Sequence, residues 1–236
     1  MRYWGQNIII DGRWIINSAD SKDNSSAQNP DADKFESDIQ DLFRVLAAND
    51  VASVIISGFS KGGFNLTVRP LSRAAGGKAQ SAPVIDSDAA ETDFGAPAAA
   101  GRGTSVNIWI NAQSMLVGDH QYRSKDTLFH ECVHALRQMR GRWRATPMSG
   151  WDNKEEFYAT MVANIYASND GRNKDMRADH RKKFTQLTES DQSFRSKYNM
   201  EILDFRYTMS DIYDGIAKNK RGWNPLRVFE STFWNR

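Results

Sequence analysis

Residues 127–136 read Thr-Leu-Phe-His-Glu-Cys-Val-His-Ala-Leu, and this stretch decides the fold that we expect. Within it, His130 and His134 are four positions apart, so on a helix both imidazole rings lie on one face and can reach one metal ion. Glu131 directly follows the first histidine, where its carboxylate can take a proton from a water molecule. Neutral imidazoles suit zinc, and a catalytic zinc site has three protein ligands and one open position. We therefore expect a zinc site on this helix, with Glu131 as the general base.

The residues around this motif favour a buried helix. We expect Ser124 to cap its start and Gly141 to end it. Apolar side chains at helical spacing predict its buried stripe: Leu128, Phe129, Cys132, Val133 and Leu136. The alternative is a core helix whose two histidines form hydrogen bonds and bind no metal, but two of only four histidines fall here in register. Cys132 lies off the ligand face and is expected to be a buried apolar residue, not a nucleophile.

We expect the third zinc ligand on a later helix. The metzincin extension of the motif needs a glycine and a histidine where this chain has Arg137 and Arg140, so that class is excluded. On the later helix, Asp152 is the expected N-cap, and Glu155 completes a capping box three residues further on. This capping role leaves Glu156 as the first choice for the ligand. Glu155 and then Asp152 remain the alternatives.

Four stretches of the sequence resemble NleD-type zinc metallopeptidase effectors, the proteases that bacteria inject into target cells. These stretches are residues 105–111, 127–136, 155–166 and 222–227. The resemblance implies a zinc-dependent endopeptidase, secreted as an effector or toxin, that acts in the cytosol of a target cell. Its expected partners are a protein or peptide substrate, and a cognate inhibitor or secretion-system carrier.

The resemblance also implies roles for individual residues. It makes His130, His134 and Glu156 the zinc ligands. It makes Glu131 the general base, and it implies that the strand at residues 105–110 is the edge strand beside the cleft. The donor that stabilises the transition state stays open among five side chains: Tyr158, Tyr166, His180, Tyr207 and Tyr213.

The order of the predicted elements favours a single zincin-like α+β domain over residues 1–236, with strands first and helices later. Residues 1–70 are expected to form a twisted β-rich part, and residues 104–236 the catalytic core with the motif helix, the Glu-bearing helix and a helical C-terminal part. The expected elements are a hairpin of residues 7–10 and 13–17, a helix at 31–49, and strands at 51–57, 64–69 and 105–110. Residues 71–103 are rich in small and polar residues and are expected to be a mobile loop.

The composition excludes several classes of protein. The chain has 31 Lys and Arg against 29 Asp and Glu, and this slight excess argues against nucleic acid as a partner. No apolar run approaches the length of a membrane span, so no membrane partner is expected. The N-terminus has no signal-peptide layout, and the single cysteine excludes an internal disulfide. We therefore expect a protein that is cytoplasmic before export and leaves by a route independent of a signal peptide.

Two further signals have plainer interpretations. Residues 58–62 match the G-x-S-x-G pattern of serine hydrolases, but a β-rich segment follows where that nucleophile needs a helix. Four arginines after the motif are expected to form a solvated helix end, although an acidic substrate region or nucleic acid would also suit them: Arg137, Arg140, Arg142 and Arg144. The alternative function is a non-proteolytic effector that binds a host protein or nucleic acid and has a structural or degenerate metal site.

Overall fold

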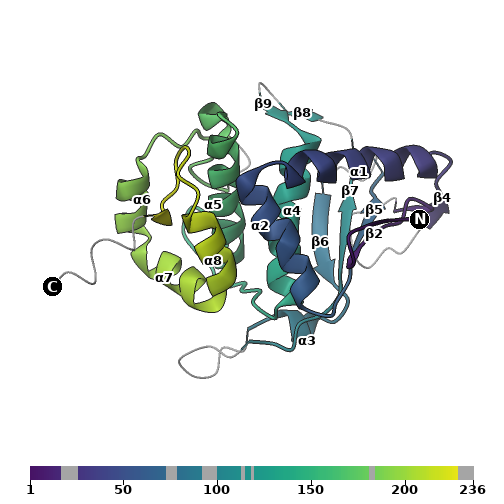
Figure 1. Cartoon of the computed structure of the whole chain (residues 1–236), viewed down its shortest axis with the longest axis horizontal. Coiled ribbons are helices and arrows are strands. Elements are labelled where there is room, and N and C mark those ends of the chain that lie inside the picture. The colour runs from purple at the N-terminus through teal and green to yellow at the C-terminus, as the bar shows by residue number, and fades with distance from the viewer. Residues whose placement is uncertain are drawn as a thin grey trace. The chain divides into compact units, whose positions relative to one another are not determined.

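The computed structural model describes residues 1–16, 26–72, 79–91, 100–112, 115–117, 120–180 and 184–227 (Figure 1). By its internal contacts the chain divides into two compact units. The first comprises Met1–Ala47 and Ile56–Arg144, and the second comprises Ala48–Ile55 and Ala145–Arg236. All the described strands belong to the first unit, and after residue 122 the named elements are all helices, so the expected α+β class is confirmed.

A five-stranded mixed sheet forms the centre of the first unit, in the order β1-β2-β5-β7-β6. Its strands are β1 (Arg2–Trp4), β2 (Ile8–Ile10), β5 (Leu66–Pro70), β6 (Ala79–Pro83) and β7 (Val106–Ile110). β2, β5 and β7 are parallel, whereas β1 and β6 run antiparallel to their neighbours at the two edges. Two strand pairs lie outside this sheet, namely β3 (Trp14–Ile16) with β4 (Ser26–Gln28), and β8 (Met115–Val117) with β9 (His120–Tyr122).

The strand expected at residues 105–110 is confirmed as β7, but it is not an edge strand. Every second residue of β7 is buried, namely Val106, Ile108 and Ile110, as a strand with one covered face requires. β7 pairs with β5 on one side and with β6 on the other. The edge strand at this side of the sheet is therefore β6, which corrects the expectation drawn from the resemblance.

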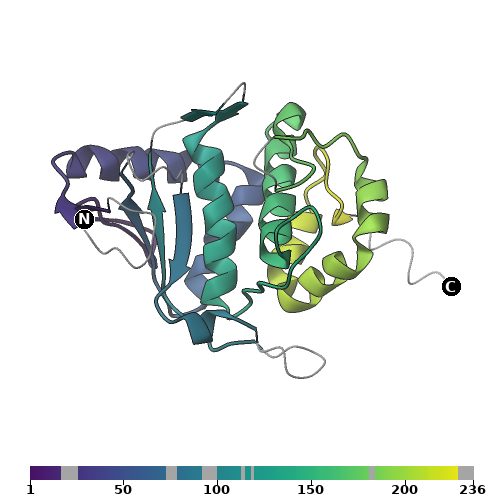
Figure 2. The same ribbon diagram turned by 180° about the vertical axis from the view of Figure 1, so that it is seen from behind.

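Two long helices complete the core of the first unit. α1 (Ala32–Ala47) confirms the helix expected at residues 31–49, and four of its apolar side chains are buried: Phe35, Ile39, Phe43 and Leu46. α1 packs against α4 (Ser124–Met139), and α4 lies along β6 and β7 (Figure 2). The helix that carries the histidine motif is thus held by the edge of the sheet and by α1.

The prediction that residues 7–10 and 13–17 form a hairpin is wrong. β2 pairs with β1 and β5, whereas β3 pairs with β4 in a separate sheet. The Asp11 amide donates to a carbonyl oxygen of β5 at 2.9 Å, which continues the parallel pairing of β2. This pairing buries Ile8 and Ile10 in the middle of the sheet, and a two-stranded hairpin could not bury them.

Residues 51–57 form a helix and not the strand that their β-branched side chains predict. α2 (Asp50–Gly58) begins after Asn49, whose side-chain oxygen accepts from the amides of Val51 and Ala52 at 2.9 and 3.1 Å. These bonds are an N-cap, and with burial they override the β propensity of the residues that follow. The strand expected at residues 64–69 is confirmed as β5.

Residues 71–103 are not a structureless loop in the part that is described. They contain β6 and the short helix α3 (Asp86–Ala89). β6 is held by backbone pairing with β7, and its small side chains give no hydrophobic pattern from which a strand could be predicted. The rest of the mobile loop predicted at residues 71–103, namely residues 73–78 and 92–99, lies outside the described residues.

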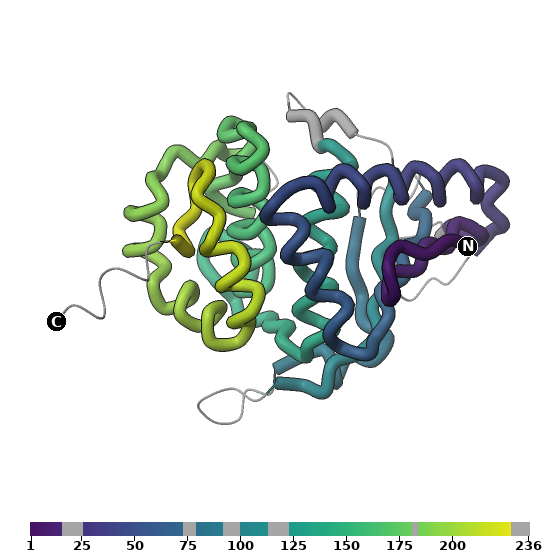
Figure 3. The backbone as a smooth tube through the Cα atoms, viewed as in Figure 1, coloured from purple at the N-terminus to yellow at the C-terminus, as the bar shows by residue number. Residues whose placement is uncertain are grey.

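The second unit is built from helices and an aromatic core. Its helices after α2 are α5 (Lys154–Asn169), α6 (Asp191–Lys197), α7 (Asn199–Thr208) and α8 (Ser210–Ala217), with the short 3-10 turn η3 (Asn173–Asp175) (Figure 3). Trp151 packs edge-on against Phe157 with the ring centroids 5.4 Å apart, and Phe157 stacks on Phe194 at 5.9 Å. These rings join the chain before α5 to α5 and α6.

The C-terminal stretch around Trp223 has a structural role. The Trp223 amide donates to the Ser168 hydroxyl of α5 at 2.6 Å. Asn224 is fully buried and donates to a carbonyl oxygen of α8, and the Tyr213 hydroxyl donates to the Leu226 carbonyl oxygen at 2.8 Å. These bonds fasten the end of the described chain to α5 and α8.

Among the described helices, none is by itself long and apolar enough to cross a membrane, and the bent pair Ala32–Ala47 and Asp50–Lys61 meets the length and composition test only when taken together.

Candidate metal centre

Helix α4 carries the H-E-x-x-H motif, and the predicted buried stripe is confirmed at all five positions. Ser124 does not cap this helix, because it is the first helical residue, and Arg123 occupies the N-cap position without a side-chain bond. The end of the helix is confirmed at Gly141, which has a φ of +63°. The Arg142 amide donates to the Arg137 carbonyl oxygen at 2.8 Å, as in a Schellman motif.

The two histidines of the motif converge. Their Nε2 atoms are 3.0 Å apart, and their rings meet edge to face with centroids 4.7 Å apart. Two nitrogen ligands at the usual distance from a tetrahedral zinc ion are about 3.3 Å apart, so the spacing fits a shared ion. The same spacing also fits a hydrogen bond between the rings of His130 and His134. The distance between the two Nε2 atoms therefore does not by itself assign a metal site, and a third ligand is needed.

The residues between the histidines are largely removed from solvent. The Glu131 residue is 9% exposed, and Cys132 is fully buried. Burial raises the pKa of the Cys132 thiol, and the charge of Glu131 raises it further. The thiol therefore stays protonated, which agrees with the predicted role of Cys132 as a buried apolar residue.

In the second unit, helix α5 carries the candidate carboxylates, and its start differs from the prediction. The N-cap is Asn153, whose side-chain oxygen accepts from the Glu156 amide at 2.9 Å. Asp152 lies one residue earlier and is not the cap, so Glu156 and not Glu155 occupies the third helical position. Glu155 therefore does not complete a capping box with Asp152, and that prediction is wrong. Glu155 is nearly fully buried, at 1% exposed, whereas the Glu156 side chain is 23% exposed.

His180 contacts the Glu156 side chain within the second unit. Its Nε2 atom is 3.3 Å from Glu156 Oε2, and its Nδ1 atom is 2.8 Å from Asp152 Oδ2. All three residues are candidates by sequence, but for separate roles: Glu156 as a ligand, Asp152 as a cap and His180 as a donor. Nothing in the sequence indicated this pairing, because 28 positions separate Asp152 from His180.

The sequence leaves four tyrosines open as transition-state donors: the buried Tyr158, Tyr166 and Tyr213, and the exposed Tyr207. Two of their hydroxyl groups have structural acceptors. The Tyr158 hydroxyl donates to the Asp204 carboxylate, and the Tyr213 hydroxyl donates to the Leu226 carbonyl oxygen.

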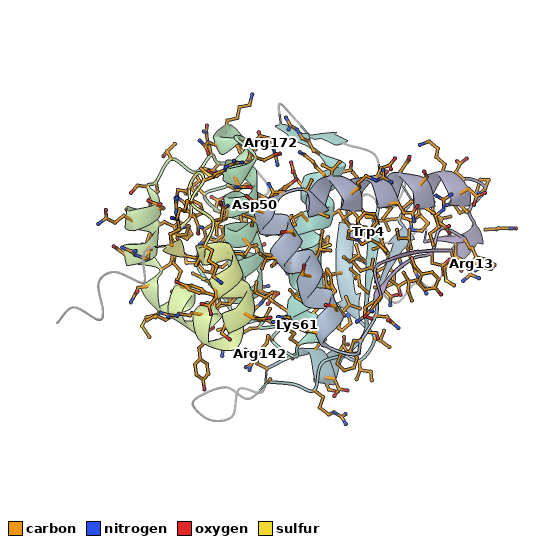
Figure 4. All side chains as sticks on the ribbon, in the orientation of Figure 1. Trp4, Arg13, Asp50, Lys61, Arg142 and Arg172 are labelled. Carbon is orange, nitrogen blue, oxygen red and sulfur yellow. The ribbon has the colours of Figure 1, made fainter. Side chains whose placement is uncertain are left out.

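The arginines that follow the motif do not form a solvated helix end. Arg137 is 1% exposed, and its guanidinium donates to the Arg142 carbonyl oxygen. Arg142, labelled in Figure 4, lies 3.5 Å from the buried carboxylate of Glu91, and Arg144 lies 2.8 Å from it. A buried carboxylate needs positive partners. No sequence pattern links Glu91 to these arginines, because it is about 50 residues before them.

The G-x-S-x-G match at residues 58–62 has no hydrolase context, as expected. The stretch runs from the end of α2 through the 3-10 turn η1 (Phe59–Lys61), and the next element is strand β5. The Ser60 hydroxyl donates to the Ser57 carbonyl oxygen at 2.8 Å. The sharp strand-to-helix turn of a nucleophile elbow is therefore not formed in this part of the chain.

Two imidazoles and one carboxylate could hold a metal ion. Among the described residues, helix α4 of the first unit offers the imidazoles of His130 and His134, and helix α5 of the second unit offers the carboxylate of Glu156. These ligand types are compatible with the metal that the sequence predicts.

A histidine motif of this kind, on a helix that packs along a mixed sheet, is typical of peptidases. The sequence model of the family Peptidase_M91, described as effector protein, matches residues 23–202, about three quarters of the chain. The chain therefore belongs to this family of peptidase effectors, and the resemblance to NleD-type effectors is confirmed. Neither the curated proteins nor the solved structures contain a match to this chain.

Proposed function

We propose that the chain is a zinc-dependent endopeptidase with a zincin-like catalytic domain. Its zinc ligands are His130, His134 and Glu156, and its general base is Glu131. The observation that carries this proposal is the convergence of two imidazole Nε2 atoms, 3.0 Å apart, on helix α4 of a member of a peptidase family. Two imidazoles and a carboxylate are a ligand set that catalytic zinc uses, and three protein ligands leave a position open.

The residues of the chain divide the chemistry between them. A bound zinc ion would polarise the scissile carbonyl and lower the pKa of water. Glu131 directly follows His130, and its low exposure keeps bulk water away from the carboxylate. The Glu131 carboxylate takes a proton from the attacking water and passes it to the leaving amine, which restores the carboxylate for the next cycle.

We also propose that the protein acts as a secreted effector on a protein of a target cell. The family description as effector protein supports this proposal. Membership of a peptidase family supports a polypeptide as the substrate, since a peptidase cleaves peptide bonds.

The experiment combines metal analysis with a cleavage profile. The purified protein should contain one zinc, and His134→Ala should contain none. In a cell lysate, wild-type protein should create new N-termini that Glu131→Gln does not, because losing a general base costs about 10²–10⁴-fold in rate. A zinc content that does not change in His134→Ala contradicts the ligand assignment. Identical profiles for wild type and Glu131→Gln favour the alternative, a non-proteolytic effector with a structural metal site.

A further inference from the structure

The loop before helix α5 contains a strained residue that the proposed chemistry does not explain. Asp152 has a φ of +60°, and it is the one non-glycine residue with positive φ in the described part of the chain. Such a conformation is uncommon for residues other than glycine, although aspartate tolerates it better than most. Strained backbone of this kind persists where the surrounding structure requires it, and it clusters at functional sites.

This loop fixes His180 in two ways. The Gly150 carbonyl oxygen accepts from the backbone amide of His180 at 2.9 Å. Two residues later, the Asp152 carboxylate lies 2.8 Å from His180 Nδ1. The backbone and the ring of His180 are thus both bound by the same short loop.

Helix α5 also holds the segment from Arg177 to His180, and this brings His180 close to Glu156. The side chain of Asn164 makes two bonds to the backbone of Arg177, one as donor and one as acceptor, each of 2.8 Å. Asn164 lies two turns after Glu156 on α5, so this double bond holds the segment against the helix. Three residues after Arg177, His180 Nε2 comes within 3.3 Å of Glu156 Oε2.

We propose that Asp152 and His180 form a positioning pair that holds the Glu156 carboxylate for the metal. His180 engages one carboxylate oxygen of Glu156, which leaves the other oxygen for the ion. Asp152 fixes the orientation of the imidazole ring by engaging its other nitrogen. Partners of this kind are known to orient metal ligands and to affect metal affinity. This proposal rests on the proposed function, in which Glu156 is a zinc ligand.

The test measures the zinc dissociation constant of the full-length protein by competition with a chromogenic chelator. His180→Ala should raise this constant about 10–100-fold. His180→Gln should recover most of that loss, because its amide can donate to Glu156 from nearly the position of Nε2. Asp152→Gly keeps the positive φ but removes the carboxylate, so it should also weaken zinc binding. Asp152→Asn keeps both the backbone conformation and an acceptor for His180, so it is the matched control and should bind zinc almost as wild type.

A second readout separates positioning from direct ligation. The cobalt-substituted protein has a visible absorption spectrum that reports the ligand set. The spectra of wild type and His180→Gln should agree, because the pair does not touch the ion. If His180→Gln binds as poorly as His180→Ala and its cobalt spectrum differs, His180 does more than position Glu156, and the proposal fails.

Glu156→Ala is the reference variant that separates a failure of the positioning pair from a failure of the ligand assignment. If Glu156→Ala loses zinc while His180→Ala and Asp152→Gly bind it as wild type, the positioning pair is refuted and the proposed zinc site stands. If Glu156→Ala binds zinc as wild type, the ligand assignment fails and the positioning pair fails with it. Should His180→Ala not fold, the comparison of Asp152→Gly with Asp152→Asn decides the question.

Discussion

Replacing Gly141 with alanine should destabilise the first unit more than its backbone conformation alone explains. Gly141 ends helix α4 with a φ of +63°, and its carbonyl oxygen accepts from the Gly101 amide at 2.9 Å. A Cβ at this position would overlap the Gly101 carbonyl group and lie 2.7 Å from its Cα atom. These are backbone atoms of another segment, so they cannot rotate away as a side chain can.

The cost has two parts. The left-handed conformation costs alanine about 1–2 kcal/mol. Separating the two segments also weakens the bond between Gly101 and Gly141, which is worth about 0.5–1.5 kcal/mol, and loosens the packing around it. We therefore expect Gly141→Ala to lower the free energy of unfolding by about 1.5–3.5 kcal/mol.

The matched control is Gly63→Ala. Gly63 has a φ of +69° in the same unit, but a Cβ there would meet nothing within 4 Å. This variant should lose only the conformational part, about 1–2 kcal/mol. The measurement is urea unfolding followed by circular dichroism. The free energies of unfolding are compared between variants whose m values agree. Equal losses for Gly141→Ala and Gly63→Ala would refute the reasoning, because the close approach of Gly101 to the end of α4 would then contribute nothing.

Two further predictions concern the helix start and the buried thiol. Asn153→Ala should lower the free energy of unfolding by about 0.5–2 kcal/mol, because the α5 cap is lost. Asn153→Ser should lower it less, since serine also caps a helix. Denaturant unfolding measures both variants, and equal losses would contradict the role of Asn153 as the cap. Cys132 should resist thiol reagents in the native protein even above the ordinary cysteine pKa of about 8.5, because burial raises its pKa and blocks access. It should react promptly once denaturant is added, and prompt reaction of the native protein in a mass-spectrometric assay would contradict the burial.

The sequence predicted the features whose signals are local. The motif helix at residues 124–139 has its histidine spacing, apolar stripe and terminal glycine within one continuous stretch. The strand at residues 106–110 alternates, and the alternation matches its burial. In each case the residues that decide the structure are also the ones that show the pattern.

The features that could not be predicted depend on residues far apart in the chain or on the backbone. The β-branched run at residues 51–57 resembles a strand, and the cap at Asn49 and tertiary burial make it a helix. β6 is held by its pairing with β7, which its own small side chains do not indicate. At the start of α5, Asp152 and Asn153 are equally good caps by residue type, and the bond from the Glu156 amide to the Asn153 side chain shows that the helix begins one residue later.

In the candidate site, too, local features could be predicted from the sequence and contacts between distant residues could not. The histidine pair and the helix that carries Glu156 follow from spacing and composition. The role of the neighbouring arginines does not, because their partner Glu91 lies about 50 residues earlier in the sequence. Likewise, the contact between Asp152 and His180 joins two loops that no sequence pattern connects.

The position of β7 in the sheet has a consequence for how the chain is made. β7 is the last of the five strands in sequence, yet it lies between β5 and β6. A ribosome therefore releases β5 with one open edge and β6 with no partner, and both wait until residues 106–110 emerge. Unpaired strand edges are sites of association between chains. Nascent chains that stop before residue 106 should aggregate, whereas chains that extend through α4 can close the sheet and cover it.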